Sequence, residues 1–170
     1  APFAALERLH KLVQAAKRLG LPESVLRFAI EEGPSRGWVD LAALPLSPAA
    51  EASAAFGSFL SMVAALRAGA GLPGGWPDFL ALLQAQDAPG IDRSGYLDAV
   101  TLRTGWDRPS VEFVSGEQGL DLSWPQGFRS GAFLSAMQPR LAILRRLGVA
   151  GGTAQAWSAA AVSMQVAQTI

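Results

Sequence analysis

The amino-acid sequence predicts an all-α protein built as an irregular array of helix–turn–helix hairpins. Three observations support this prediction. Apolar residues recur three or four positions apart over long stretches, which is the period of an amphipathic α-helix. Most of these stretches end at a glycine that is followed by an apolar residue, as at many helix C-termini. No run of alternating apolar and polar residues is long enough to predict a β-strand.

The first hairpin is expected over residues 3–32. Leu9 and Val13 belong to an apolar row at helical spacing, and the row stops at Gly20. Glycine readily adopts the left-handed backbone conformation that commonly follows a helix C-terminus, so Gly20 is the predicted turn. Pro22 then opens a second helix, at a position where its missing N–H costs nothing.

The same order recurs in three further segments. The remaining hairpins and their turns are expected at residues 50–85 with Gly71, 93–117 with Gly105, and 132–168 with Gly148. The glycines are unevenly spaced, which indicates a degenerate array rather than a regular solenoid. Pro139 falls inside the apolar row of the last hairpin, so the first helix there either begins near Gln138 or is kinked.

The centres of the apolar rows predict the core, and the segments between them predict the loops. Residues 33–38, 86–92 and 116–131 are expected to be loops. Eight side chains are expected to be largely buried: Leu9, Val13, Leu26, Phe59, Val63, Leu97, Leu141 and Leu144.

The C-terminal stretch is the candidate interface. Only 16% of the chain is charged, against about 25% in an ordinary domain, which indicates that protein covers part of its surface. Residues 147–170 contain no charged side chain at all. We expect this end either to self-associate or to be disordered. The apolar side chains expected at the interface are Val149, Trp157, Val162, Met164, Val166 and Ile170.

No residue pattern predicts an enzyme, a cofactor or a metal site. Gly33-Pro34-Ser35-Arg36-Gly37 has the spacing of a nucleophile elbow, but that elbow requires a preceding strand and a histidine base within reach. The single histidine, His10, lies on a different predicted helix. We interpret the motif as a loop that ends a helix. The absence of cysteine excludes disulfides and thiolate chemistry.

Nucleic acid and a membrane are not predicted partners. The formal net charge is zero, so no overall field attracts phosphates. Residues 52–66 are the most apolar stretch, but they are too few and too rich in alanine and serine to span a bilayer. Two basic clusters lie near ends of predicted helices, where the helix dipole favours cations. They are Lys11, Lys17 and Arg18, and Arg140, Arg145 and Arg146.

Several short motifs resemble, in order, the A component of insecticidal Tc toxin complexes. The motifs are Ala16-Lys17-Arg18-Leu19-Gly20-Leu21, Thr104-Gly105-Trp106-Asp107, and Ala142-Ile143-Leu144-Arg145-Arg146-Leu147-Gly148-Val149 followed by Gln155-Ala156-Trp157. Two features depart from that family. Gly151-Gly152 stands where the family begins its next helix with Ser-Ala, and the connection 116–131 is richer in glycine.

The resemblance implies a non-catalytic segment of the helical shell around the translocation channel of a large, pentameric, pore-forming toxin subunit. The implied location is outside the bacterium or on its surface, although no signal peptide is visible. The implied partners are the rest of the same polypeptide, neighbouring protomers and a host-surface receptor. The alternative is a stand-alone helical scaffold or adaptor domain that binds a protein partner. Residues 1–170 are a piece of a larger shell in the first case and a single helical domain in the second.

Overall fold

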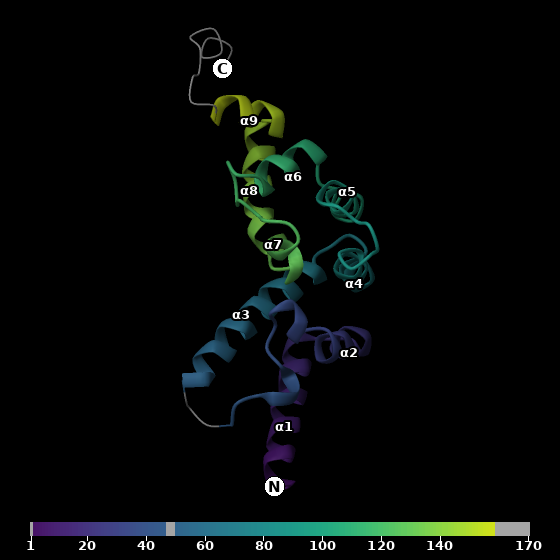
Figure 1. Ribbon diagram of the computed structural model, residues 1–170, viewed down its shortest axis with the longest axis vertical. Coiled ribbons are helices and arrows are strands. Elements are labelled where there is room, and N and C mark those ends of the chain that lie inside the picture. The colour runs from purple at the N-terminus through teal and green to yellow at the C-terminus, as the bar shows by residue number, and fades with distance from the viewer. Residues whose placement is uncertain (1, 47–49, 159–170) are drawn as a thin grey trace.

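The computed structural model describes residues 2–46 and 50–158, and it is built from helices joined by turns (Figure 1). Helices account for 72% of the structure, and the described ranges contain no strand. The all-α prediction is therefore confirmed. The elements in chain order are α1 (Pro2–Leu19), α2 (Glu23–Glu31), the 3-10 helices η1 (Pro34–Arg36) and η2 (Leu41–Ala43), α3 (Ala50–Ala70), α4 (Gly75–Ala85), α5 (Arg93–Thr104), α6 (Arg108–Ser115), α7 (Gln126–Arg129), α8 (Phe133–Leu147) and α9 (Gly151–Ser158).

Consecutive helices fall within the residue ranges expected for the hairpins. The pairs α1–α2, α3–α4, α5–α6 and α8–α9 occupy the four expected ranges, although the last range continues beyond the described residues. Of the three expected loops, 86–92 contains no helix, 33–38 contains η1, and 116–131 contains the single turn of α7.

Three of the four predicted turn glycines have a left-handed backbone. The φ angles are +61° at Gly20, +68° at Gly105 and +66° at Gly148. Gly71 is the exception, since its φ is not positive; the left-handed residue here is Gly75, the first residue of α4, with φ +61°. The turn at Gly71 was predicted in the right segment, but its geometry does not require glycine at that position.

Two of these turns close by the same hydrogen-bond pattern. The N–H of Leu21 donates to the carbonyl of Ala16 over 3.1 Å, and the N–H of Val149 donates to that of Leu144 over 3.0 Å. These six-residue bonds on either side of a left-handed glycine define a Schellman motif, which satisfies carbonyls at the helix end.

The core lies in the middle of an elongated molecule. Helix α8 packs against α3 and α6, and α4, α5 and α6 follow one another along one side (Figure 1). Helix α9 packs on α6 at the C-terminal end, while α1 extends at the opposite end. An aromatic cluster fills the centre, with the Phe128 ring 5.6 Å from Tyr96 and 5.0 Å from Phe133.

The predicted core is only partly correct. Leu97 and Leu141 are buried, and four others are half-buried: Leu26, Phe59, Val63 and Leu144. Leu9 and Val13 were predicted wrongly, because they are 56% and 39% exposed. Helix α1 turns a different side, with Leu12 and Leu19, toward the core, and it contacts the η2 segment. The apolar row on α1 is therefore real, but the described residues leave much of it uncovered.

Helix α8 begins at Phe133 and continues through Pro139. The alternative start near Gln138 is therefore wrong. Proline removes one hydrogen bond and crowds the preceding turn of a helix. Burial of Leu134, Met137 and Leu141 on both sides of Pro139 supplies the packing that holds this helix together.

Candidate interaction surfaces

The Gly33–Gly37 motif forms a helix-terminating loop, as its sequence context predicted. Ser35 lies in η1, is exposed, and donates its hydroxyl hydrogen bond to the carbonyl of Glu32 over 2.8 Å. His10 is exposed on α1. No group of three or more His, Cys, Asp or Glu side chains within the described ranges could hold a metal ion.

Arg36 is the residue of this motif that matters for the structure. Its side chain is only 3% exposed and forms an ion pair with Asp87, which follows α4. Its guanidinium lies 5.1 Å from the centre of the Phe28 ring, close enough for a cation–π contact. The Nε and Nη1 atoms are buried and have no hydrogen-bond partner among the described residues. Nothing in the sequence pattern predicts a buried arginine here.

Further polar contacts lie between the α2–α3 connection, the end of α4 and the region of α7. The indole N–H of Trp38 donates to the carbonyl of Ser130 over 2.8 Å. The amide nitrogen of Gln86 donates to the Tyr96 hydroxyl over 2.7 Å and to the carbonyl of Phe128 over 2.8 Å. Burial raises the pKa of Tyr96 far above its usual range, so the phenol stays neutral. The Trp38 bond ties the α2–α3 connection to the residues that follow α7, and the Gln86 bonds tie the end of α4 to α5 and α7.

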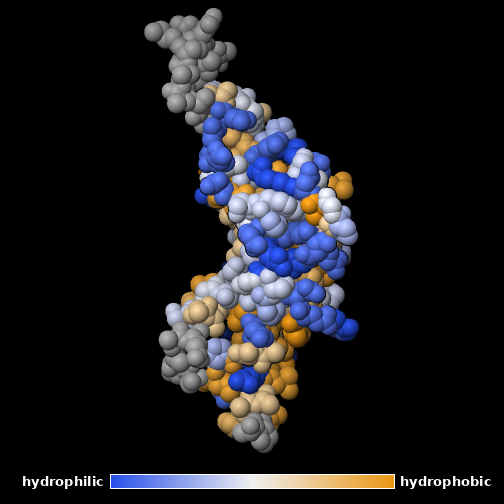
Figure 2. Space-filling view, viewed as in Figure 1, coloured by the Kyte–Doolittle hydropathy of each residue, from blue (hydrophilic) through white to orange (hydrophobic). Residues whose placement is uncertain are grey.

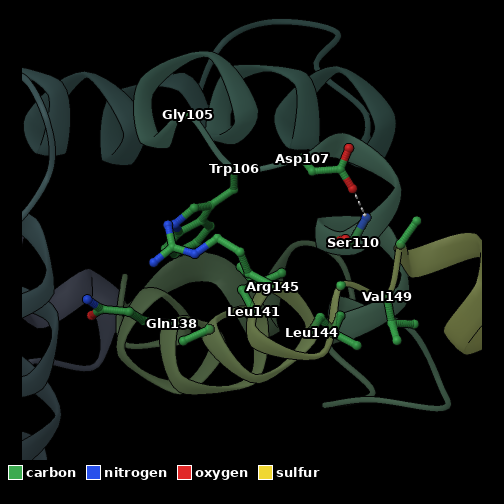
Figure 3. A pocket seen from close by; sticks show the side chains of 12 residues that line it. Gly105, Trp106, Asp107, Ser110, Gln138, Leu141, Leu144, Arg145 and Val149 are labelled. Atoms are coloured by element: carbon green, nitrogen blue, oxygen red, sulfur yellow. Dashed lines mark hydrogen bonds between the residues drawn. The ribbon is translucent and has the colours of Figure 1, made fainter.

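The first candidate surface is a groove between the α5–α6 turn and α8, with a volume of about 550 Å³ (Figure 3). We call it the α8 groove. Its lining residues are Gly105, Trp106, Asp107, Ser110, Gln138, Leu141, Ala142, Leu144, Arg145, Gly148, Val149 and Ala150. The two motifs around Gly105 and Gly148 that carry the resemblance thus meet at one place.

Helix caps fix the walls of the α8 groove. The Asp107 carboxylate accepts a hydrogen bond from the N–H of Ser110 over 3.0 Å and so caps the N-terminus of α6. The Ser110 hydroxyl in turn accepts from the N–H of Gly151 over 3.2 Å, at the start of α9. On the other wall, Gln138, Leu141, Ala142 and Arg145 share one face of α8 because they are spaced at i, i+3, i+4 and i+7.

The second candidate surface is apolar and lies at the N-terminal end. On α1, Phe3 is 75% exposed and Leu6 is 64% exposed; on α3, Phe56 is 61% exposed and Leu60 is 51% exposed. Hydrophobic residues gather over this end of the molecule in Figure 2. We call Phe3, Leu6, Leu9, Val13, Phe56 and Leu60 the N-terminal apolar surface. The sequence predicted the apolar rows but not that they face outward.

Helix α3 combines core and surface. Its residues Ser53–Ala70 have a mean hydropathy of 1.2 and are long and apolar enough to cross a membrane by length and composition alone. Only 22% of this segment is buried. Met62, Ala65 and Leu66 in its second half are buried, which is also typical of a core helix in a protein that spans no membrane. The helix is therefore longer than the stretch 52–66 that was expected to be too short for a bilayer, but length and composition alone assign no span to α3.

The predicted C-terminal interface is only partly within the described residues. Val149 is half-buried in the lining of the α8 groove, and Trp157 is half-buried on α9. The remaining members, Val162, Met164, Val166 and Ile170, lie outside the described residues. Self-association or disorder of this end stays a prediction.

Comparisons with protein-family models, with characterised proteins and with solved structures found no match. The resemblance to a family therefore rests on the short sequence motifs alone.

Proposed function

We propose that the chain is a non-catalytic structural and interaction segment of a larger helical protein, belonging to the shell of a protein-translocating toxin subunit of the Tc type. In that role the helical hairpins form a rigid support, and their uncovered apolar faces pack against other parts of the same polypeptide or against neighbouring protomers. Any enzymatic activity belongs to other subunits.

The observation that carries the proposal is the N-terminal apolar surface. Isolated apolar residues are common on protein surfaces, but several large ones on two helices at one end are typical of a protein contact. Phe3, Leu6, Phe56 and Leu60 are each more than half exposed. An array of hairpins buries its apolar faces only by stacking on further elements, so an uncapped end calls for a neighbour.

The motifs that resemble Tc toxins have a local explanation as well. Gly105 and Gly148 occupy left-handed caps, Asp107 caps α6, and Arg145 lies in the last turn of α8. Any helical hairpin with these turns would favour the same residue types. What supports a shared architecture is therefore their order along the chain and their meeting in the α8 groove.

The test is the complete reading frame that encodes these residues and the protein it produces. We expect a frame several-fold longer than 170 codons, and we expect electron microscopy of its product to show a ring of five protomers around a central channel. A product of about the present length that stays monomeric would overturn the toxin assignment.

A substitution tests the apolar surface within that complete protein. We expect Leu6→Glu combined with Leu60→Glu to prevent correct assembly while leaving the far-UV circular dichroism unchanged. The matched control is Leu102→Glu on α5, because Leu102 is 82% exposed but belongs to a different surface. Equal behaviour of the two variants would contradict a role for the N-terminal apolar surface.

The alternative is a stand-alone scaffold domain, and the α8 groove favours it. A volume of about 550 Å³ is within the range of pockets that hold a ligand or a few side chains of a peptide. A monomeric product of about 170 residues that binds a peptide in this groove would establish the scaffold reading.

A further inference from the structure

The charges of this chain are segregated along its length. The last acidic residue is Asp121, whereas Arg129, Arg140, Arg145 and Arg146 follow it. The net charge is zero over the whole chain, so the part before residue 122 has a matching surplus of acidic groups. The C-terminal third is a purely basic end on a neutral molecule.

Three of these arginines lie on α8 and form no ion pair with any residue that the structure describes. The ion pairs among the described residues involve Lys11, Arg27, Arg36, Arg103 and Arg108. Arg140 donates only to the carbonyl of Ala136, one turn earlier on its own helix. All three α8 arginines are exposed. Arg36, Arg103 and Arg108 have carboxylate partners, whereas no acidic residue lies on α8 itself.

Arg145 places one of these charges in an apolar groove. It lines the α8 groove together with Leu141, Leu144 and Val149, and Figure 3 shows its side chain on the same side of α8 as Trp106. The one carboxylate in the lining, Asp107, already accepts the hydrogen bond that caps α6. Arg145 therefore has hydrogen-bond donors free for a ligand that enters the groove.

We propose that the α8 groove binds an acidic amphipathic peptide segment of a partner protein. An apolar side chain of the peptide enters between Trp106 and the aliphatic residues of α8. A carboxylate next to it binds the guanidinium of Arg145, and Arg146 beside it on α8 attracts a further acidic residue of the peptide. Arginine suits this role, because its planar guanidinium pairs with a carboxylate through two parallel hydrogen bonds.

The groove favours such a peptide over nucleic acid for two reasons. Tight binding to a phosphate backbone relies on many cationic contacts and a basic field, whereas the groove itself holds one arginine and the protein has zero net charge. The aliphatic floor instead matches an apolar anchor, which is how helical and extended peptides are held in grooves.

The inference gives a partner class to the proposed interaction function and does not depend on the toxin assignment. Peptide binding by a stand-alone product of about 170 residues would support the groove and overturn the toxin proposal. A long, ring-forming product whose α8 groove binds no acidic peptide would support the toxin proposal and overturn the peptide-binding inference.

The experiment measures fluorescence anisotropy of three labelled probes with the intact chain. The first probe is a short peptide with leucine and glutamate at helical spacing, the second has glutamine in place of every glutamate, and the third is a single-stranded oligothymidylate. We expect the acidic peptide to bind and the glutamine peptide to bind at least about tenfold more weakly. Added salt should weaken the complex with the acidic peptide.

Two matched double variants locate the site. Arg145→Gln with Arg146→Gln should weaken the acidic peptide by about tenfold or more. Lys17→Gln with Arg18→Gln removes the same charge from the last turn of α1, which ends at a left-handed glycine in the same way, and should leave binding unchanged. Trp106→Ala should weaken both peptides, because it removes the apolar wall.

Several outcomes would overturn the proposal. They are no binding of the acidic peptide, equal binding of the two peptides, equal losses in the two double variants, and preferential binding of the oligothymidylate. The last result would identify the α8 arginines as a phosphate-binding surface. Circular dichroism of each variant shows whether the fold is kept, and the Lys17/Arg18 variant provides the reference.

Discussion

At the scale of single residues, Asp87 supplies the counter-charge for the buried guanidinium of Arg36. Its carboxylate pairs with Arg36, whose side chain is 3% exposed, whereas Asp87 itself is 56% exposed. Loss of the carboxylate leaves a buried guanidinium without a counter-charge, and two of its nitrogens already lack a hydrogen-bond partner among the described residues. Stranding a buried charge costs far more than losing a surface pair.

We therefore expect Asp87→Asn to lower the free energy of unfolding by about 1–3 kcal/mol. The matched control is Glu23→Gln, which removes the carboxylate from an exposed pair with Arg27 and should change stability by less than about 0.5 kcal/mol. Urea unfolding followed by tryptophan fluorescence measures both. Equal effects would mean that Arg36 is solvated in solution.

Gly148 and Gly71 differ at the same scale. Gly148 has φ +66°, so a side chain there is strained. Gly71 lacks a positive φ, and an added Cβ would meet nothing closer than the Ala68 carbonyl oxygen at 3.5 Å. We expect Gly148→Ala to cost about 1 kcal/mol of stability and Gly71→Ala to be neutral or slightly stabilising. A cost at Gly71 as large as at Gly148 in thermal unfolding would contradict the turn geometry.

At the scale of elements, the contact between α6 and α9 depends on one glycine. A Cβ added at Gly151 would lie 2.4 Å from the carbonyl oxygen of Pro109, whereas one added at Gly152 would meet nothing within 4 Å. The Gly-Gly pair that departs from the Tc family motif is therefore required at its first position. The second glycine only lowers helix propensity.

This pair of neighbours makes a controlled experiment. We expect Gly151→Ala to destabilise the chain by about 1–3 kcal/mol, since α9 must move away from α6. Gly152→Ala should stabilise it by up to about 1 kcal/mol. The measurement is the midpoint of chemical unfolding followed by far-UV circular dichroism. Destabilisation by both substitutions would show that α9 does not pack as described.

Leu97 and Leu9 both lie in helices, but only Leu97 is buried. Leu97 is 1% exposed on α5, and Leu9 is 56% exposed on α1. We expect Leu97→Ala to cost about 2–5 kcal/mol and Leu9→Ala to cost less than about 1 kcal/mol, because little apolar area is buried there. Thermal unfolding monitored by circular dichroism distinguishes the two. A large loss of stability in Leu9→Ala would mean that Leu9 is buried in solution, as its sequence position predicted.

The same leucines show what the sequence could reveal. Helices α1 and α5 were predictable because their apolar spacing and the glycines at their C-terminal ends, Gly20 and Gly105, are local signals. Whether a helix face meets the core depends on segments far away in the chain. Leu9 and Leu97 look alike in sequence, yet only Leu97 meets the core. Arg36 was missed for the same reason, since its partner Asp87 lies 51 residues away.

At the scale of the whole molecule, stability is unevenly distributed along the long axis. Helices α4, α5, α6 and α8 each contain fully buried side chains, among them Phe79, Tyr96, Val111 and Met137. None of residues 3–19 of α1 is buried. An isolated helix of this length is marginal in water, so α1 depends on its few contacts with the η2 segment, including the bond from the Lys11 ammonium to the carbonyl of Pro45.

Amide hydrogen exchange measures this gradient directly. In dilute solution we expect the amides of α1 to exchange through local opening, with protection factors at least about a hundredfold below those of α5 and α8, which open only when the core unfolds. Covering the N-terminal apolar surface should slow exchange in α1 selectively, so its protection should rise in the complete, assembled protein while that of α5 stays the same. Equal protection of α1 and α5 in the dilute monomer would mean that α1 already has a partner within the chain. In that case, the N-terminal apolar surface would not be a site for assembly.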